Sequence, residues 1–546
     1  MKAQRLSLHD VKAILCTPSE NSCTDLQCAF RHQEAPLLRQ TIWLVLLVIL
    51  VIPVSLCFAQ SRETAEQRTA RFLDSVRSQP SLLLAFLQQM PKGGDLHNHL
   101  DGAVYAESFV DYAADNRQCV DRTTAQVLPG PCDRCDKYTN KPAASCAYQD
   151  QVLYNSLIDA WSMRNWHPEQ ESGHDHFFAT FDKFIPASEG HIGDMLAEAA
   201  GRAAANHLQY LELMHTADRM QAAQLGAKLG WEDDFGKQRD KLLASGLKDV
   251  IAAVRKQLDE DEAKMHALLH CGAGQPDRGC DVTVRYLYQV LRGLPREQVF
   301  AQILLGYELA STDPRFVGLN LVMPEDWYVP MRDFRLHMSI LEFMHRTYPK
   351  IHLTLHAGEL AMGMVPPEGL RFHMRESIER AHAERIGHGV SVMEEDDSIG
   401  LLREMAGRNV MVEINLTSND GILGVKGMNH PLPVYLRYGV PVALSTDDEG
   451  VNRSNITHEF LRAVQTYGLS YAELKRMARQ SLEHSFLPGQ GLWTSTKTFS
   501  LTKACANDPA DAGRVSAPCT AFLDANEKAR VQWRLERALA VFEKSH

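Results

Sequence analysis

The sequence has no excess of positive charge. Its 57 Lys and Arg residues are outnumbered by 68 Asp and Glu residues, and the formal net charge is −11. Because nucleic acid is bound through basic surfaces, this balance excludes it as the main partner. The chain also lacks internal repeats and low-complexity tracts. Its 546 residues fit one large barrel with insertions.

Long apolar runs are scarce, with one exception. Thr41 to Ala59 is uncharged and just long enough to cross a bilayer. Basic residues precede it, so we expect the N-terminus to stay in the cytoplasm and the rest to be exported to a periplasmic or extracellular location. We predict a polar segment over 1–40 and a signal peptide or membrane anchor over 41–60. A later start near Leu37 or Leu38 and an uncleaved anchor both remain open.

Cysteine is also rare, but its distribution agrees with export. Eight cysteines follow position 60, and an even number in an exported chain indicates disulfides. Cys271 and Cys280 bracket one loop, and Cys505 and Cys519 bracket another. Four more lie between residues 119 and 146, where Cys132 and Cys135 form a Cys-x-x-Cys. We favour disulfides over zinc there, because no second Cys-x-x-Cys follows.

Short apolar runs alternate with helical patterns along the remaining chain. Beside a first strand ending at His99, we predict strands over 208–215, 301–308, 316–322, 351–356, 384–388, 410–416 and 440–446. Eight strands alternating with helices predict an α/β fold, a (β/α)8 TIM barrel over 61–500. A Cys-containing insertion follows strand one at about 115–170, and 501–546 forms a C-terminal disulfide loop and helix.

The segment Met90 to Gly102, MPKGGDLHNHLDG, carries two histidines separated by one residue. Side chains two residues apart on a strand share a face, so His97 and His99 present neighbouring imidazoles. Asp101 lies two residues after His99, so the same alternation directs its side chain to the same face. A lone HxH is as often an incidental strand end, so its meaning depends on the other strand ends.

Three later strand ends supply the remaining chemistry. HLTLHAGE carries His356 and, past a glycine, Glu359. RIGHG exposes His388 between two glycines, and STDD ends in Asp447 and Asp448. Alone, each of these motifs has an ordinary structural explanation, such as a helix N-cap for the two aspartates. Together, three histidines and an aspartate are a typical ligand set for Zn²⁺.

These strand ends resemble the adenosine deaminase family of the amidohydrolase superfamily. MPKGGDLHNHLDG, LHAGE, RIGHG and STDD carry the resemblance, which runs from about Met90 to Phe486. It implies a zinc-containing (β/α)8 barrel that hydrolyses the 6-amino group of adenosine to give inosine and ammonia. The implied ligands of the single zinc ion are His97, His99, His356 and Asp447.

The resemblance also implies catalytic and substrate-binding roles. Glu359 would donate a proton to purine N1, and His388 would orient the metal-bound hydroxide. Three residues would bind the substrate: Asp101 at the ribose 5′-hydroxyl, Gly318 of FVGLNL at N3 through its backbone, and Asp448 at N7.

General chemistry supports these roles independently. Zinc lowers the pKa of bound water towards about 7. Attack on an aromatic carbon requires that the ring nitrogen gain a proton, and a buried carboxyl with a raised pKa can supply it. Glu359 is the only carboxylate on a ligand-bearing turn, and Glu413 is the next candidate. The predicted site differs from the His/Cys/Cys zinc sites of other base deaminases.

Departures from the family pattern leave the identity of the purine substrate open. They follow Gly318 and Asp448 and include EINLTSND at 413–420. We expect adenosine and 2′-deoxyadenosine as substrates, with another aminopurine nucleoside or nucleotide as the alternative. Asp101 argues against a 5′-phosphate.

A secreted adenosine-binding factor with a vestigial site is a third possibility, against which the retained Glu359 and ligands speak. The insertion stands where secreted, growth-factor-like adenosine deaminases carry an extra domain. The sequence leaves the oligomeric state open, and a homodimer is one candidate.

We predict that Thr41 to Ala59 inserts into the membrane and that the residues after 60 lie outside the cytoplasm. Cell fractionation with thiol labelling checks this. A full-length protein in the cytoplasmic fraction with all eight later cysteines free would contradict it.

Overall fold

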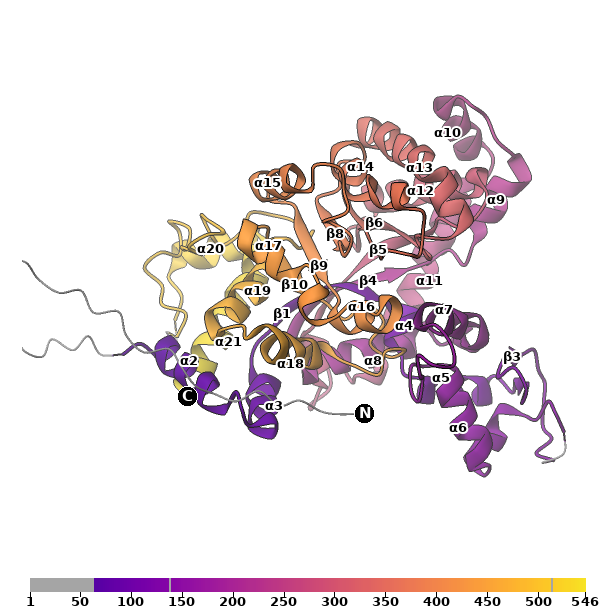
Figure 1. The fold of residues 1–546 in the computed structure, drawn as a ribbon, viewed down its shortest axis with the longest axis horizontal. Helices are drawn as coiled ribbons and strands as arrows, with labels where there is room; N and C mark the ends of the chain where they lie inside the picture. Colours follow the sequence, from indigo (N-terminus) through magenta and orange to yellow (C-terminus); the bar gives the residue numbers. More distant parts are fainter. Residues whose placement is uncertain (1–62, 137–138, 512–513) are drawn as a thin grey trace, which may run out of the picture. The chain divides into compact units, whose positions relative to one another are not determined.

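The computed structural model describes residues 63–136, 139–511 and 514–546, and Thr64–His546 forms one unit. Its centre is an eight-stranded parallel sheet with the order β1-β4-β5-β6-β7-β8-β9-β10 (Figure 1). The strands are β1 Gly93–His99, β4 Leu208–His215, β5 Thr283–Leu291, β6 Phe316–Val322, β7 His352–Ala357, β8 Arg385–His388, β9 Met411–Ile414 and β10 Val442–Leu444.

The loop after β10 closes the sheet into a barrel. The Asp447 backbone N–H donates to the His97 carbonyl at 2.9 Å, and the Asp447 carbonyl accepts from the His99 N–H at 3.0 Å. One segment therefore joins the last strand to the first at the mouth of the barrel. This confirms the predicted (β/α)8 barrel with a Cys-containing insertion after its first strand.

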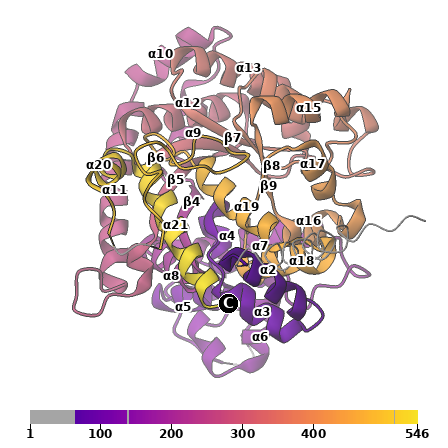
Figure 2. The same cartoon turned by 90° about the vertical axis from the view of Figure 1, so that its left-hand side faces the viewer.

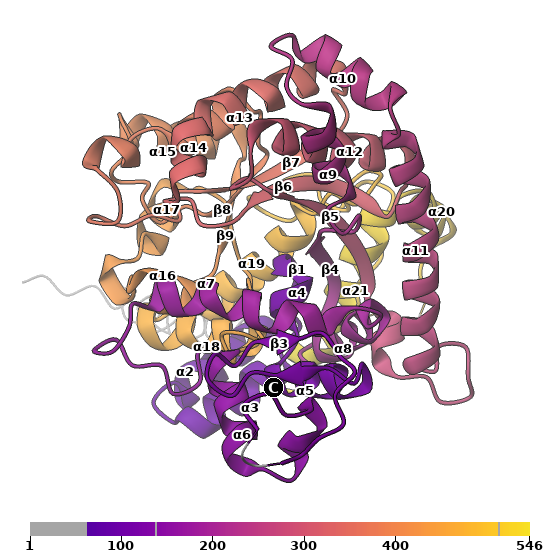
Figure 3. The same cartoon turned by 90° about the vertical axis from the view of Figure 1, so that its right-hand side faces the viewer.

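Helices between the strands cover the outside of the barrel (Figures 1 and 3). They are α8 Ile192–Ala205, α9 Gln221–Leu229, α10 Phe235–Ala244, α11 Leu247–Leu268, α12 Arg296–Thr312, α13 Tyr328–Thr347, α14 His373–Glu379, α15 Ser398–Arg408, α16 Leu416–Leu423, α17 Leu432–Tyr438, α18 Ile456–Tyr467 and α19 Tyr471–Glu483. Most carry one buried apolar face, which explains why their periodicity is visible in the sequence.

The predicted strand over 301–308 is wrong. These residues lie in α12, and the third strand of the barrel is β5. Every residue of α12 from Val299 to Tyr307 is buried, so the helix shows no polar face that would distinguish it from a buried strand. In contrast, β5 includes Arg285 and Gln289, which interrupt its apolar pattern. The other predicted strands match observed strands to within two residues at each end.

The N-terminal end of the barrel is covered by segments from both ends of the described chain. Helices α2 (Ala65–Val76) and α3 (Pro80–Gln89) precede β1, and α20 (Ala517–Ala525) and α21 (Glu527–Lys544) follow the barrel. Figure 2 shows α21 and α19 beside one another. Leu96 and Tyr210 pack with Leu482 and Leu535 in one buried apolar cluster. Helices α19 and α21 therefore cover the end opposite the predicted site.

The insertion after β1 is held by two disulfides. It follows the short α4 (Leu100–Ala103) and α5 (Ala106–Asp115), and contains the β2–β3 hairpin (Cys119–Val120, Val127–Leu128) and α6 (Gln151–Ala160). Cys119 pairs with Cys132, and Cys135 pairs with Cys146. The two cysteines of Cys-x-x-Cys thus bind different partners. The next helix, α7 (Gly173–Phe184), returns the chain to the barrel (Figure 3).

The other disulfides close the two loops that the sequence indicated. Cys271 pairs with Cys280, and Cys505 pairs with Cys519. All eight cysteines of the described residues are therefore in disulfides, as predicted. The predicted membrane segment Thr41 to Ala59 lies outside the described residues. Within the described part of the chain, no helix combines the length and the apolar character needed to span a bilayer.

A buried arginine ties the barrel interior together. The Arg385 guanidinium on β8 lies 2.5 Å from Glu212 Oε2 on β4 and 2.6 Å from Glu413 Oε1 on β9. All three side chains are fully buried. Glu413 also accepts from the Thr354 hydroxyl at 2.8 Å. Because unpaired charges are costly in such surroundings, each carboxylate needs this cation.

We expect Arg385→Met to destabilise the fold by about 3–5 kcal/mol, since it leaves two buried carboxylates without a cation. The midpoint of thermal unfolding measures this loss. The control is Arg346→Met, because Arg346 forms only an exposed helix pair with Glu342 and should contribute about 0.3–0.5 kcal/mol. Equal midpoints for the two variants would refute the proposed importance of Arg385.

Candidate active site

The predicted ligand side chains converge at the C-terminal mouth of the barrel. Their ligand atoms all lie within 4.8 Å of one another. His356 Nε2 is 3.1 Å from His97 Nε2 and 3.3 Å from His99 Nε2. Asp447 Oδ1 is 3.2 Å from each of the latter two nitrogens. Thus β1, β7 and the loop after β10 each contribute to one cluster.

This cluster fits a divalent cation. Four atoms about 2.0–2.1 Å from a tetrahedral zinc ion are about 3.3 Å apart, which is the spacing found here. Asp447 Oδ1 is buried and has no hydrogen-bond partner in the described part of the protein. Imidazole lone pairs that face one another repel unless a cation lies between them. Nitrogen and carboxylate oxygen ligands are a donor set that zinc accepts.

The outer nitrogen of each predicted ligand histidine is engaged by a neighbouring strand. His97 Nδ1 lies 2.7 Å from Glu413 Oε2, and His99 Nδ1 lies 2.8 Å from Gln289 Oε1. His356 Nδ1 lies 2.9 Å from Asn320 Oδ1. Because each partner atom is an acceptor, each Nδ1 carries the proton and each Nε2 lone pair faces the cluster.

The two aspartates after β10 take different positions. Asp447 Oδ2 accepts from the Ser418 hydroxyl at 2.6 Å, which fixes its carboxylate. Asp448 is buried, and its Oδ1 has no hydrogen-bond partner among the described residues. A Cβ at Gly102 would lie 1.6 Å from this oxygen, so only glycine fits there. Burial raises the pKa of Asp448 well above its usual value, which favours a carboxyl that can donate a hydrogen bond.

Glu359 lies beside His388 at the mouth of the barrel. It is buried, and its Oε1 is 3.6 Å from His388 Nε2. Its backbone N–H donates to Glu325 Oε2 at 2.8 Å, which holds the turn after β7. Burial raises the pKa of Glu359 well above the usual value, and the charges of Asp447 and Glu325 add to this effect. A protonated carboxyl near neutral pH suits a general acid.

His388 is oriented by a chain of buried hydrogen bonds. The Leu432 backbone N–H donates to His430 Nδ1 at 3.1 Å, so His430 carries its proton on Nε2. That nitrogen donates to Asn419 Oδ1 at 3.0 Å, and Asn419 Nδ2 donates to His388 Nδ1 at 2.8 Å. His388 is therefore the Nε2–H tautomer. This N–H is directed towards the region between Glu359 and Asp447.

Glu413, the alternative proton donor, does not suit that role. Burial alone would raise its pKa, but the charge of Arg385 and the hydrogen bond with His97 lower it to about 2. A carboxylate with this pKa stays ionised and cannot donate a proton at neutral pH. The structure instead gives Glu413 the task of orienting His97.

Gly318 does not join the site, so its predicted contact with purine N3 is not supported. It lies in the N-terminal half of β6, where a Cβ would meet the His352 carbonyl at 2.8 Å and Phe486 at 3.2 Å. The residue that follows β6 at the mouth is Met323, with a φ of 82°. This left-handed backbone usually selects glycine.

Comparison with known proteins agrees with this geometry. The family model described as adenosine deaminase matches residues 167–492, which is more than half of the chain. The chain belongs to the adenosine deaminase family. Curated adenosine deaminases from Pectobacterium atrosepticum and Escherichia coli are 33% identical over 183 residues and 34% identical over 197 residues. These matches cover 33% and 36% of this chain and 49% of each relative, so the chain spans about half the length of the curated relatives it matches.

Solved structures of similar fold include two bacterial enzymes. An adenine deaminase from Arthrobacter aurescens is 18% identical with a TM-score of 0.47, and the match covers 73% of this chain and 94% of that one. An amidohydrolase from Burkhoderia ambifaria, solved with bound Zn, is 16% identical with a TM-score of 0.47, and the match covers 84% and 95%.

Several site residues of this family member escaped the sequence analysis. Gln289 and Asn320 are single amides on strands, and nothing in their neighbourhood marks them as partners of histidine. His430 lies on the loop before α17, far from the strand ends where we searched. The only sequence signal was the run Thr-Ser-Asn at 417–419, which holds Ser418 and Asn419 within EINLTSND.

Asn419→Asp reverses one hydrogen bond at almost constant size. A carboxylate only accepts, so His388 would move its proton to Nδ1 and present a lone pair from Nε2. We expect kcat to fall by about 10²–10⁴-fold, as when a catalytic histidine is held in the wrong tautomer, with metal content unchanged. Asn155→Asp is the control, because among the described residues the Asn155 side chain is hydrogen-bonded only through its accepting Oδ1. A kcat for Asn419→Asp equal to that of this control would contradict the assignment.

Proposed function

We propose that the protein is a hydrolytic adenosine deaminase that converts adenosine and 2′-deoxyadenosine to inosine and ammonia with one zinc ion per chain. The observation that carries the proposal is a cation-binding cluster that shares one buried site with Glu359 and His388. When bound there, zinc would lower the pKa of a coordinated water to about 7 and thus supply a nucleophile at neutral pH.

The residues around the cluster match the proton transfers of this reaction. Addition of water oxygen at C6 moves an electron pair onto N1, and the Glu359 carboxyl supplies the proton that N1 then needs. The Nε2–H of His388 provides a fixed donor that orients the attacking water. The C6–N6 bond then breaks, and the two protons of the attacking water restore the Glu359 carboxyl and protonate the amine, which leaves as ammonia.

Two acidic residues support the binding of the rest of the nucleoside. Purine N7 is a hydrogen-bond acceptor, and a protonated Asp448 supplies the matching donor. Asp101, on α4 next to the cluster, suits the ribose 5′-hydroxyl. A negative charge at this end disfavours a 5′-phosphate, which supports a nucleoside over a nucleotide as substrate.

We also propose that the enzyme acts outside the cytoplasm. The support is the pairing of all eight cysteines in the described residues as disulfides, because such bonds persist mainly in oxidising compartments. The uncharged segment Thr41 to Ala59 would direct the export.

Two variants separate proton transfer from metal binding. Glu359→Gln keeps the shape of the side chain but removes the acid, so turnover of adenosine should fall by about 10²–10⁴-fold while one zinc per chain is retained. His356→Ala should lose both zinc and activity, because three remaining ligands bind the ion more weakly. Metal analysis and the loss of adenosine absorbance measure the two effects.

The wild-type protein provides the reference for both variants. Purified wild-type protein with no stoichiometric transition metal, or with no turnover of adenosine or 2′-deoxyadenosine, would refute the proposed function. Turnover by Glu359→Gln above about a tenth of wild type, a level well above the expected loss, would remove only the proton-donor assignment.

A further inference from the structure

A large cavity adjoins the predicted site on the side of Asp101. Its volume is about 1040 Å³, at the top of the range of about 300–1,000 Å³ for pockets that hold drug-sized ligands. The barrel contributes Asp101, His215 and Gln289 to its lining. The disulfide-linked insertion contributes residues 116–118 and 126–131.

The cavity extends beyond the place where the nucleoside would bind. Asp101 is the residue proposed for the ribose 5′-hydroxyl, and Gln289 holds the outer nitrogen of His99. The residues proposed to act on the purine, Glu359 and His388, do not line it. With the purine at the cation cluster and the ribose at Asp101, this volume lies on the 5′ side of the sugar.

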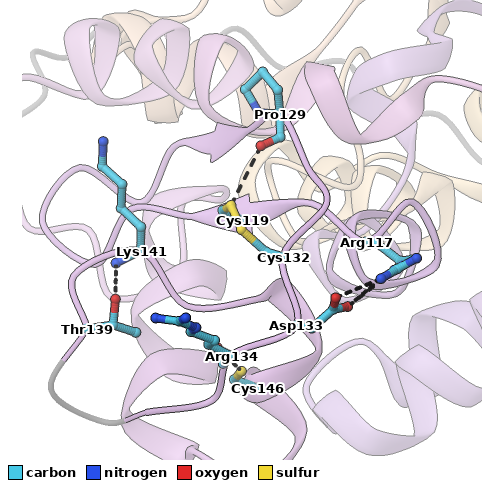
Figure 4. The surroundings of a disulfide bond; sticks show 9 residues. All are labelled: Arg117, Cys119, Pro129, Cys132, Asp133, Arg134, Thr139, Lys141 and Cys146. Atoms are coloured by element: carbon cyan, nitrogen blue, oxygen red, sulfur yellow. Dashed lines mark hydrogen bonds and ion pairs between the residues drawn. A yellow bond between two sulfur atoms is a disulfide. The ribbon is translucent and has the colours of Figure 1, made fainter.

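The outer wall of the cavity is fixed by covalent bonds. The Cys119–Cys132 disulfide closes the segment that carries β2 and β3, next to Pro129 (Figure 4). The Arg117 guanidinium beside it pairs with Asp133 at 2.7 Å. Strand β3 also packs on the 3₁₀ helix η2 (Ile185–Ser188), which lines the same cavity. The wall therefore has a defined position relative to the barrel.

The lining is mainly apolar and contains two unsatisfied polar groups. Apolar side chains come from the hairpin, from η2 and from the barrel: Val127, Leu128, Pro129, Ile185, Ile192 and Leu291. His215 and Gln118 are only 7% and 8% exposed. His215 Nδ1 and Gln118 Oε1 have no hydrogen-bond partner among the described residues. Both atoms are almost fully covered by neighbouring atoms, so the accessible surface of the cavity is mainly apolar.

The charges of the lining do not favour a phosphate. Arg117 is neutralised by Asp133. Arg219 makes no ion pair with a described residue, but it shares the cavity with two carboxylates, Asp101 and Glu189. A dianionic group would therefore meet no surplus of positive charge.

We propose that this cavity is a second substrate subsite, which accepts adenine nucleosides extended at the 5′ position by an uncharged, mainly apolar group. The hairpin wall covers the apolar part of that group. This inference rests on the proposed function, because Asp101 and the cation cluster set the orientation of the nucleoside.

The first test compares kcat/KM of the wild-type enzyme for four substrates: adenosine, 5′-methylthioadenosine, adenosine 5′-ethylcarboxamide and AMP. We expect adenosine 5′-ethylcarboxamide, whose amide N–H replaces the 5′-hydroxyl as a donor to Asp101, to equal or exceed adenosine, and AMP to be lower by about 10²-fold or more. Burial of one additional apolar group usually changes kcat/KM by about 10–200-fold. An ethylcarboxamide that reacts at least about 10²-fold more slowly than adenosine would overturn the proposal, and so would a preference for AMP.

The second test alters the wall. Leu128→Trp fills the cavity, and Cys119→Ser with Cys132→Ser releases the hairpin. In each we expect the ratio of kcat/KM for 5′-methylthioadenosine to that for adenosine to fall by about tenfold or more. Cys271→Ser with Cys280→Ser is the matched control, since this disulfide joins residues outside the cavity lining and should leave the ratio unchanged. A ratio that is the same in all variants would overturn the proposal.

A failure of the proposed function gives a different result. In that case the wild-type protein would turn over none of the four compounds. Calorimetric binding of 5′-methylthioadenosine to wild type and to Leu128→Trp would then test the cavity alone. We expect at least about tenfold weaker binding to the variant, and equal binding to the two proteins would refute the subsite. Thermal unfolding establishes that each variant is folded.

Discussion

The buried guanidinium of Arg385 is the constraint on which the barrel and its site both depend. It bridges Glu212 on β4 and Glu413 on β9, which would otherwise be two carboxylates in an apolar interior. Glu413 in turn holds His97 Nδ1 at 2.7 Å. The charge that stabilises the interior of the barrel thus also orients the first histidine of the cation cluster. A change at Arg385 therefore acts on folding and on metal binding through the same carboxylate.

The same principle applies to all four histidines of the site. In each, an acceptor or donor on the outer nitrogen decides which face of the imidazole is presented to the inside. Glu413, Gln289 and Asn320 accept from the three histidines of the cluster, whose lone pairs then face the cation position. Asn419 does the reverse for His388, because its amide donates to Nδ1 and leaves an N–H on Nε2. Histidine side chains thus supply both the three predicted ligands and the one hydrogen-bond donor.

The sequence predicts those parts of the molecule that depend on local spacing. His97 and His99 are recognisable because alternate residues of a strand share a face, and Glu359 because it follows a ligand across a glycine. Features that depend on tertiary contacts are not predictable in this way. Helix α12 lacks a polar face because other elements surround it, so it resembles a strand.

Gln289 and Asn320 gain their meaning only from the strands beside them. Gly318 is predicted only from its resemblance to a family glycine, whereas Met323 is the residue that adopts the left-handed conformation at the mouth. The resemblance to a family could supply the identities of the ligands, but not the residues that orient them.

The position of the insertion follows from the topology of the barrel. Any segment that follows the C-terminal end of a strand begins at the mouth, where the site lies. The chain between α5 and α6 is short and has few apolar residues of its own, so it cannot form a separate core of useful size. Two disulfides, Cys119–Cys132 and Cys135–Cys146, stabilise this segment in place of an apolar core. In the proposed function, a wall built in this way stands over the 5′ side of the substrate without adding contacts to the barrel interior, so that substrate range and catalytic chemistry would be set by separate parts of the chain.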